Sequence, residues 1–223
     1  MTNFTIGMIF SEAFAMMKRN VPLFGIFVLA SLLLSSLAVL GVSEFSANLI
    51  EPLGSIVIGY VFLHMLLSKE NLAQGAMSLG NALAYLGVYI VAGIGMILGF
   101  VLLLVPGLFL AARWSLVTQL VVGEELSVSE ALSRSWELTG PRQWTIIGYV
   151  AIVMLIGLIG ATLLGGGLAT FMMAGGDVAP RSSGFSLVLN LFGSIGGAFL
   201  VASGVALYRL LALGENEAEH VFG

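Results

Sequence analysis

The chain has 223 residues, of which 59% are hydrophobic and only 9% are charged, whereas soluble domains carry about 25% charged residues. This composition excludes a soluble globular protein and predicts an integral membrane protein. The formal net charge of -4 disfavours nucleic-acid binding, and the lack of cysteine excludes disulfides, thiol catalysis and cysteine-bound metal.

Six apolar runs are long enough to span a membrane. They cover residues 21–41, 50–67, 82–104, 106–122, 143–164 and 186–211. The first run, at about 20 residues, exceeds the hydrophobic region of a signal peptide, so we interpret it as a retained span. The sequence therefore predicts an all-α membrane protein with six transmembrane helices in a single polytopic domain, which leaves no room for a separate catalytic domain.

The third and fourth runs meet at "LLLVPGLF". Pro106 and Gly107 interrupt the apolar pattern there, and both residue types break helices. We expect a tight hairpin at this point.

Two stretches outside the spans, residues 4–20 and 126–144, have amphipathic helical spacing. In the second, Ser127 and Glu130 fit a capping box, and Gly140 with Pro141 ends the helix. We expect both helices to lie in the cytoplasmic interface, each before a span. The polar and aromatic residues expected at the second interface are Arg134, Trp136, Glu137, Arg142 and Trp144.

Short matches in the same order suggest an internal duplication. "SEAF" at 11–14 corresponds to "SEAL" at 129–132, and "GSI" occurs at 54–56 and at 193–195. The predicted units are a first repeat (1–67), the hairpin of two spans (68–122), a second repeat (123–213) and a polar tail (214–223). Each repeat consists of one interfacial helix and two spans, and the two repeats enter the membrane from the same side.

The basic residues fix the predicted orientation, because positive charge is retained on the cytoplasmic side. A cytoplasmic N-terminus places five basic residues in the cytoplasm and only Arg181 in an outside loop. The five are Lys18, Arg19, Lys69, Arg134 and Arg142. We expect both termini to be cytoplasmic.

The segment 105–144, "VPGLFLAARWSLVTQLVVGEELSVSEALSRSWELTGPRQW", resembles the membrane domain fused to some bacterial glycerophosphoryl diester phosphodiesterases and the related stand-alone membrane proteins. The matching residues are Pro106, Gly107, Arg113, Trp114, Ser115, Ala131, Leu132, Ser135, Trp136, Leu138, Thr139, Gly140 and Trp144. The resemblance implies a multi-pass protein of the bacterial cytoplasmic (inner) membrane. Phosphodiesterase chemistry belongs to a soluble domain of those proteins, so no catalytic residue carries over and we expect no enzyme activity.

Arg113 is the most informative single residue, because a guanidinium inside a membrane span is costly. It lies about seven residues into its run, roughly 10 Å from the outer end of a straight helix. One interpretation is a binding site for a lipid phosphate or another anion, with Trp114 as an interfacial anchor. The favoured alternative is internal pairing with Glu51, with His64 or with a nearby carbonyl, which would fix helix packing.

The remaining candidates favour structural roles. His64 suggests a proton relay, but a lone membrane histidine more often makes one interhelical hydrogen bond. Glu217 and His220 have the spacing of half a di-iron site, yet they lie in the polar tail. We expect no metal and no cofactor, and no nucleophile or metal-ligating motif is present in the sequence.

Two functions remain open at this stage. A protein that handles or transports a lipid or small anionic amphiphile predicts a lateral or central crevice in which Arg113 is exposed. A structural or regulatory scaffold for envelope proteins predicts a fully paired Arg113 and no cavity. The expected partners are membrane lipids, with a second membrane protein or a further copy of this chain as additional candidates.

Overall fold

The computed structural model describes residues 4–36, 44–102, 104–173 and 184–222, and every regular element in these ranges is a helix. The elements are α1 (Ile6–Arg19), α2 (Val21–Ser36), α3 (Glu44–Lys69), α4 (Leu79–Leu102), α5 (Leu104–Arg113), α6 (Val117–Gly123), α7 (Val128–Thr139), the 3-10 turn η1 (Gly140–Arg142), α8 (Gln143–Met173) and α9 (Gly184–Phe222). The prediction of an all-α protein is confirmed.

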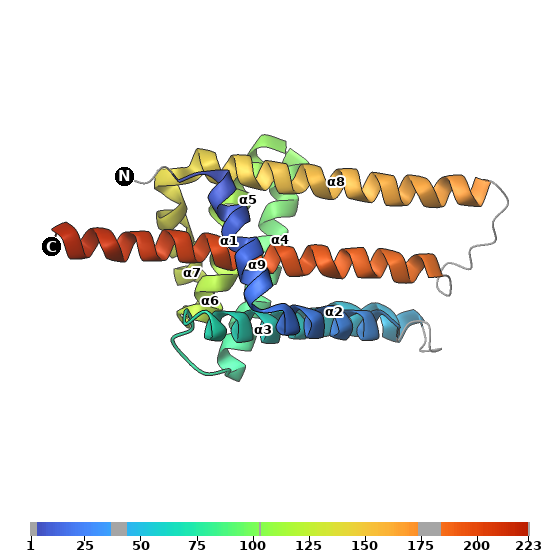
Figure 1. Cartoon of the computed structure of the whole chain (residues 1–223), viewed down its shortest axis with the longest axis horizontal. Coiled ribbons are helices and arrows are strands. Elements are labelled where there is room, and N and C mark those ends of the chain that lie inside the picture. The colour runs from blue at the N-terminus through green and yellow to red at the C-terminus, as the bar shows by residue number, and fades with distance from the viewer. Residues whose placement is uncertain (1–3, 37–43, 103, 174–183, 223) are drawn as a thin grey trace.

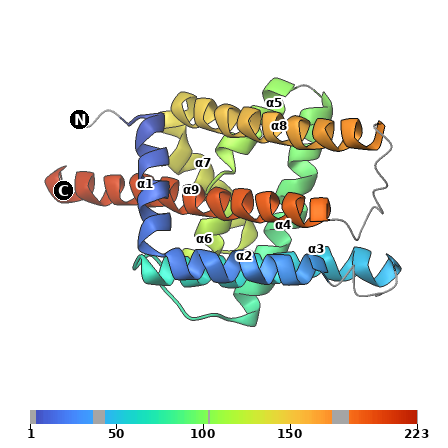
Figure 2. The same ribbon diagram turned by 45° about the vertical axis from the view of Figure 1, so that its right-hand side comes forward.

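The long helices α2, α3, α8 and α9 run in a common direction, and α4 crosses them (Figures 1 and 2). Helices α1, α6 and α7 gather toward one end of this arrangement, and the last turns of α9 reach the same end (Figure 1). The beginning and the end of the described chain therefore lie on one side, as two cytoplasmic termini require. Which compartment that side faces stays a prediction.

Four helical segments are long and apolar enough to cross a membrane, or five if the bent pair α1 and α2 forms one span. The four are Leu49–Lys69, Val105–Gly123, Val128–Gly160 and Val188–Ala212, within the described residues. The predicted third span falls on α4, of which Leu79–Gly95 counts only as a shorter apolar helix. The number of six spans is therefore not confirmed, whereas a multi-helix membrane protein is supported.

The hairpin expected near Pro106 is present as the antiparallel pair α4 and α5 (Figure 1). The helix does not end at the proline. Pro106 is the third residue of α5, in the first turn, where its missing N–H leaves no hydrogen bond unmade. A Cβ on Gly99 would lie 3.0 Å from the Cα of Gly107, so the two helices approach backbone to backbone close to their connection.

The predicted fourth span is broken directly after Arg113. Helix α5 ends at Arg113 and α6 begins at Val117, so Trp114 to Leu116 interrupt the helix. The segment Val105–Gly123 still counts as one of the four possible spans, but it is not the continuous helix on which the expected depth of Arg113 was based.

Helices occur at both predicted amphipathic stretches: α1 within 4–20, and α7 within 126–144, where it continues through η1 into α8. In α7 the Ser127 and Glu130 capping box is present in both directions, and the helix ends at Thr139. Helix α1 meets α2 at an angle of 87°. That the two helices lie in the membrane interface stays a prediction, as does the duplication, although a short helix followed by two long ones occurs twice.

The predicted polar tail is an extension of α9, which continues to Phe222. The side chains of Glu217 and His220 lie outside the described residues, and so does Arg181.

The core lies where α1, α3, α6 and α9 meet, and it contains the fully buried residues Met16, Leu66, Val121 and Leu207. The segment Val128–Gly160, which contains α7 and the first part of α8, contrasts with this core, because only 11% of its apolar window is buried. Apolar side chains along one helix that stay exposed to this extent fit contact with lipid, in which they need no protein partner.

Candidate functional site

Arg113 is bound by the protein itself. Its Nη1 donates a hydrogen bond to the carbonyl oxygen of Trp136 (3.0 Å), and its Nη2 donates one to Oε1 of Gln143 (2.8 Å). The guanidinium also lies over the rings of Trp136 (4.7 Å) and Phe109 (5.3 Å), a cation–π arrangement. Because Arg113 is the last residue of α5, its charge also faces the negative end of that helix dipole.

Residues around Arg113 connect α5 to α7 through hydrogen bonds and close packing. The hydroxyl of Ser135 donates to the carbonyl oxygen of Arg113 (2.6 Å), and the hydroxyl of Thr139 donates to the carbonyl oxygen of Ser135 (2.7 Å). A Cβ on Gly140 would lie 3.1 Å from Nη1 of Arg113, so a glycine leaves room for the guanidinium. The motif residues of segment 105–144 thus form one packing unit.

The other residues proposed for a binding site at Arg113, or as its pairing partners, lie elsewhere. Glu51 accepts a hydrogen bond from Ser35 on α2 (3.2 Å) and lines a separate polar hollow beside it. Trp114 packs its ring against Gly95 of α4, where a Cβ would overlap the ring. The four tentative ligand-binding residues, Arg113, Trp114, His64 and Glu51, are therefore not brought together. The hydrogen-bond partners of Arg113 are the carbonyl of Trp136 and the side chain of Gln143, not Glu51 or His64.

His64 fastens the loop between α3 and α4. Its Nε2 lies 3.2 Å from the carbonyl oxygen of Gly75, and its Nδ1 lies 3.5 Å from the hydroxyl of Ser68. Tyr60, one turn earlier on α3, donates to the carbonyl oxygen of Ser78 (3.2 Å) in the same loop. His64 thus makes hydrogen bonds, but its partners lie in the loop and on its own helix, not on a second helix as the interhelical interpretation expected.

The predicted interface residues of α7, η1 and the start of α8 are exposed or partly exposed. Arg134 pairs with Glu137 at 3.5 Å, with both side chains well exposed. Trp144 is 77% exposed, and the guanidinium of Arg142 lies 5.1 Å from the ring of Phe4. Exposed tryptophan and arginine side chains suit a membrane interface, although the structure contains no membrane.

A charge cluster that the sequence analysis missed joins α1, α3 and α9. Each of the carboxylates of Glu12 and Glu70 pairs with both guanidiniums, those of Arg19 and Arg209, at 2.7–3.3 Å. The side chain of Glu70 is only 7% exposed, and it also accepts a hydrogen bond from Asn20 (2.7 Å). The sequence feature that could have indicated this cluster is Arg209, because it is a cation inside an apolar run.

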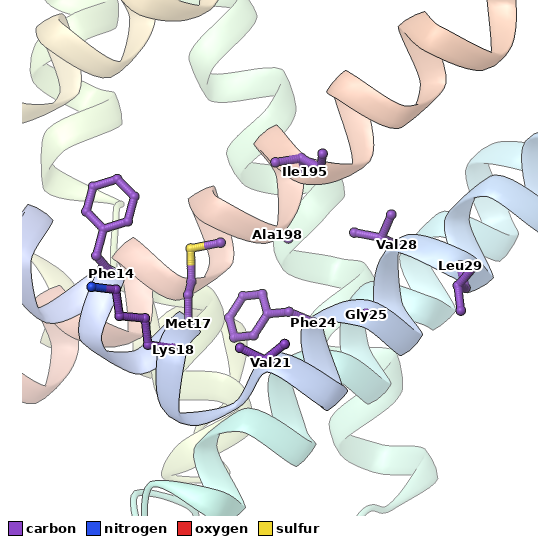
Figure 3. A pocket seen from close by; sticks show the side chains of 10 residues that line it. All are labelled: Phe14, Met17, Lys18, Val21, Phe24, Gly25, Val28, Leu29, Ile195 and Ala198. Atoms are coloured by element: carbon purple, nitrogen blue, oxygen red, sulfur yellow. The ribbon is translucent and has the colours of Figure 1, made fainter.

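Above the bend between α1 and α2 lies a lateral groove of about 590 Å³ (Figure 3). Its lining comes from the end of α1, the first turns of α2 and one face of α9, and consists of Phe14, Met17, Lys18, Val21, Phe24, Gly25, Val28, Leu29, Ile195 and Ala198. Lys18 is the sole charged residue in this lining, and it lies at the α1 end of the groove (Figure 3).

The groove and the bonding of Arg113 each agree with a different one of the two predicted functions. A lateral cavity is present, as lipid handling requires, yet Arg113 does not line it. Two nitrogens of Arg113 are bonded internally, but its buried Nε has no hydrogen-bond partner among the described residues, so the full pairing that the scaffold hypothesis expects is only partly present. In size and apolar character the groove suits an acyl chain or another elongated apolar group, since ligand pockets typically enclose about 300–1,000 Å³. Within the described residues, no group of three or more His, Asp or Glu side chains could hold a metal ion.

Comparison with known proteins finds a family match that covers residues 85–217 of the chain. The model of the family described as the membrane domain of glycerophosphoryl diester phosphodiesterase matches residues 85–217, from within α4 to within the last turns of α9. No curated protein and no solved structure matches the chain. The matched region contains α5, the Arg113 packing unit, α7 and α8, and it covers more than half of the chain. The protein therefore belongs to the family of the glycerophosphoryl diester phosphodiesterase membrane domain.

Proposed function

We propose that the protein is a non-enzymatic lipid-handling protein of the bacterial inner membrane, and that it holds one phospholipid or similar amphiphile in the lateral groove. The observation that carries this proposal is the apolar groove at the 87° bend between α1 and α2. The bound molecule would place its apolar chain between α2 and α9.

The position of the groove supports a lipid rather than a water-soluble ligand. Nine of its ten lining residues are apolar or glycine, and they include exposed side chains such as Phe14 (53%) and Leu29 (61%). A groove that opens sideways into a bilayer is surrounded by lipid, so an acyl chain is the molecule available to fill it. A polar ligand would find only the amine of Lys18 to bind.

The predicted orientation places this site in the cytoplasmic leaflet. Lys18 and Arg19 end α1, and the positive-inside rule assigns them to the cytoplasm. Helix α2 then leads into the membrane, so a lipid of the inner leaflet would lie along α2 with its headgroup beside α1. Both termini are cytoplasmic in this arrangement.

Filling the groove tests the proposal. A Cβ on Gly25 meets no atom within 4 Å, so Gly25→Leu adds a side chain to the groove without disturbing the helix contacts. Gly157→Leu on α8 is the matched control, because that position is also open but lies outside the groove. Native mass spectrometry after mild delipidation should detect one retained phospholipid in the wild type and in Gly157→Leu, and none in Gly25→Leu. Equal retention in all three proteins would overturn the proposal.

A scaffold for envelope proteins is the second candidate, and the internal bonding of Arg113 favours it. Under this alternative the packing unit of α5 and α7 serves only to hold the fold, and the groove has no preferred occupant. Affinity purification from native membranes distinguishes the two: a stoichiometric protein partner that survives Gly25→Leu supports the scaffold, and a retained lipid supports the groove.

A further inference from the structure

Lys18 lies next to the charge cluster of Glu12, Arg19, Glu70 and Arg209 but does not take part in its ion pairs. Arg19, its neighbour in sequence, pairs with Glu12 and Glu70, and Arg209 pairs with the same two carboxylates. Lys18 is exposed, and no carboxylate among the described residues forms an ion pair with it. Its charge is therefore available to a ligand.

The cluster is electrically balanced. Two carboxylates face two guanidiniums at 2.7–3.3 Å, so their charges cancel, and Lys18 is the charged residue among the described residues that line the groove. The cluster also fixes the position of α1 against α3 and α9, because Glu70 directly follows the last residue of α3 and Arg209 lies on α9. The backbone of Lys18 is consequently held at one end of the groove, and its exposed side chain lies within reach of the groove.

The groove is amphipathic along its length. The amine of Lys18 lies at the α1 end, and Val28 and Leu29 lie at the other end, beyond Phe24 (Figure 3). Val21 and Leu29 are separated by about 12 Å at 1.5 Å per residue of helix. One cationic end followed by an apolar channel matches a phospholipid, which has an anionic phosphate followed by an acyl chain.

We propose that Lys18 binds the phosphate of an anionic phospholipid, so that the groove selects lipids with a net negative charge over zwitterionic ones. This inference rests on the proposed function and adds to it the charge of the ligand. A zwitterionic headgroup carries its own cation beside the phosphate, and that cation would lie close to Lys18 and oppose binding. An anionic headgroup such as phosphatidylglycerol has no such cation.

Competition between two lipids of equal chain length tests the selectivity. The delipidated full-length protein is offered an equimolar mixture of phosphatidylglycerol and phosphatidylcholine in detergent, and native mass spectrometry measures the ratio bound. The wild type should prefer phosphatidylglycerol. Lys18→Gln should lower that preference roughly fivefold, which is the effect of one lysine at an anionic lipid surface. Lys18→Arg keeps the charge and should retain the preference.

Lys69→Gln is the charge-matched control, since it removes one exposed cation at the end of α3 that does not line the groove. Its bound ratio should equal that of the wild type. If Lys18→Gln leaves the ratio unchanged while Gly25→Leu abolishes lipid retention, the selectivity is refuted and the lipid groove stands. If Gly25→Leu also retains lipid, the groove itself is refuted, and both proposals fail.

Discussion

The guanidinium of Arg113 is held twice by Trp136, through a hydrogen bond to its backbone oxygen (3.0 Å) and through the face of its ring (4.7 Å). Two residues 23 positions apart thus close the contact between α5 and α7. The charged residue in this apolar run therefore stabilises the contact between two helices. Its replacement should lower the stability of the protein.

Arg113→Gln should destabilise the protein without changing its lipid content. The substitution removes the hydrogen bonds to Trp136 and Gln143, and a hydrogen bond to a charged group contributes about 1.5–3 kcal/mol. Arg113→Lys should recover only part of the loss, because an ammonium lacks the planar fork that reaches both acceptors. Thermal unfolding in detergent measures the stability. A variant of wild-type stability that has lost its lipid would instead make Arg113 a ligand-binding residue.

Glu70→Gln should also destabilise the protein, by about 1.5–3 kcal/mol. The substitution leaves the guanidiniums of Arg19 and Arg209 facing one carboxylate instead of two. Glu137→Gln is the control, because its pair with Arg134 is exposed and pairs of that kind contribute about 0–1 kcal/mol. Chemical denaturation of both variants in the same detergent makes the comparison, and equal midpoints would show that the cluster does not hold α1 in place.

His64→Leu should loosen the loop between α3 and α4, because it removes the contact with the carbonyl oxygen of Gly75. His64→Gln can still donate a hydrogen bond and should retain most of the protection. Hydrogen exchange of the loop amides, residues 71–78, measures this effect. Equal exchange in the wild type and in His64→Leu would contradict the structural role and return attention to proton transfer.

Gly95→Ala should displace Trp114, because the added Cβ would overlap the indole ring. Overpacking of this kind costs about 1–3 kcal/mol. Gly93→Ala is the control, since its Cβ would meet no atom within 4 Å and the change removes the helix-weakening effect of glycine. Thermal unfolding should separate the two variants, and a neutral Gly95→Ala would mean that α4 and the segment after α5 are not tightly packed.

The local elements could be predicted from the sequence, because they depend on neighbouring residues. The capping box of Ser127 and Glu130 and the helix end at Thr139 follow from side chains within one turn. The same holds for the hairpin near Pro106. The apolar pattern of residues 82–104, by contrast, is the same whether the helix runs along the bundle or across it. Its direction depends on distant contacts, such as that of Gly95 with Trp114.

The candidate site could be predicted only in part, for a similar reason. Glu70 and Arg209 are 139 positions apart, and no spacing rule connects them. The groove depends on the angle between α1 and α2, and Pro22 indicates that a helix begins there without indicating its direction. The lipid-handling hypothesis expected Arg113 in a lateral crevice, but Arg113 does not line the groove, because its guanidinium is bonded to Trp136 of α7 and to Gln143.

Photo-crosslinking tests the central claim, an acyl chain in the groove, most directly. A phosphatidylglycerol with a photoreactive group on its acyl chain is added at one equivalent to the delipidated protein in detergent, and the adducts are located by mass spectrometry. The groove predicts adducts on residues 14–29 and 195–198, and their loss in Gly25→Leu but not in Gly157→Leu. Adducts that instead follow general exposure, with most of the label on the open face of α8, would contradict it.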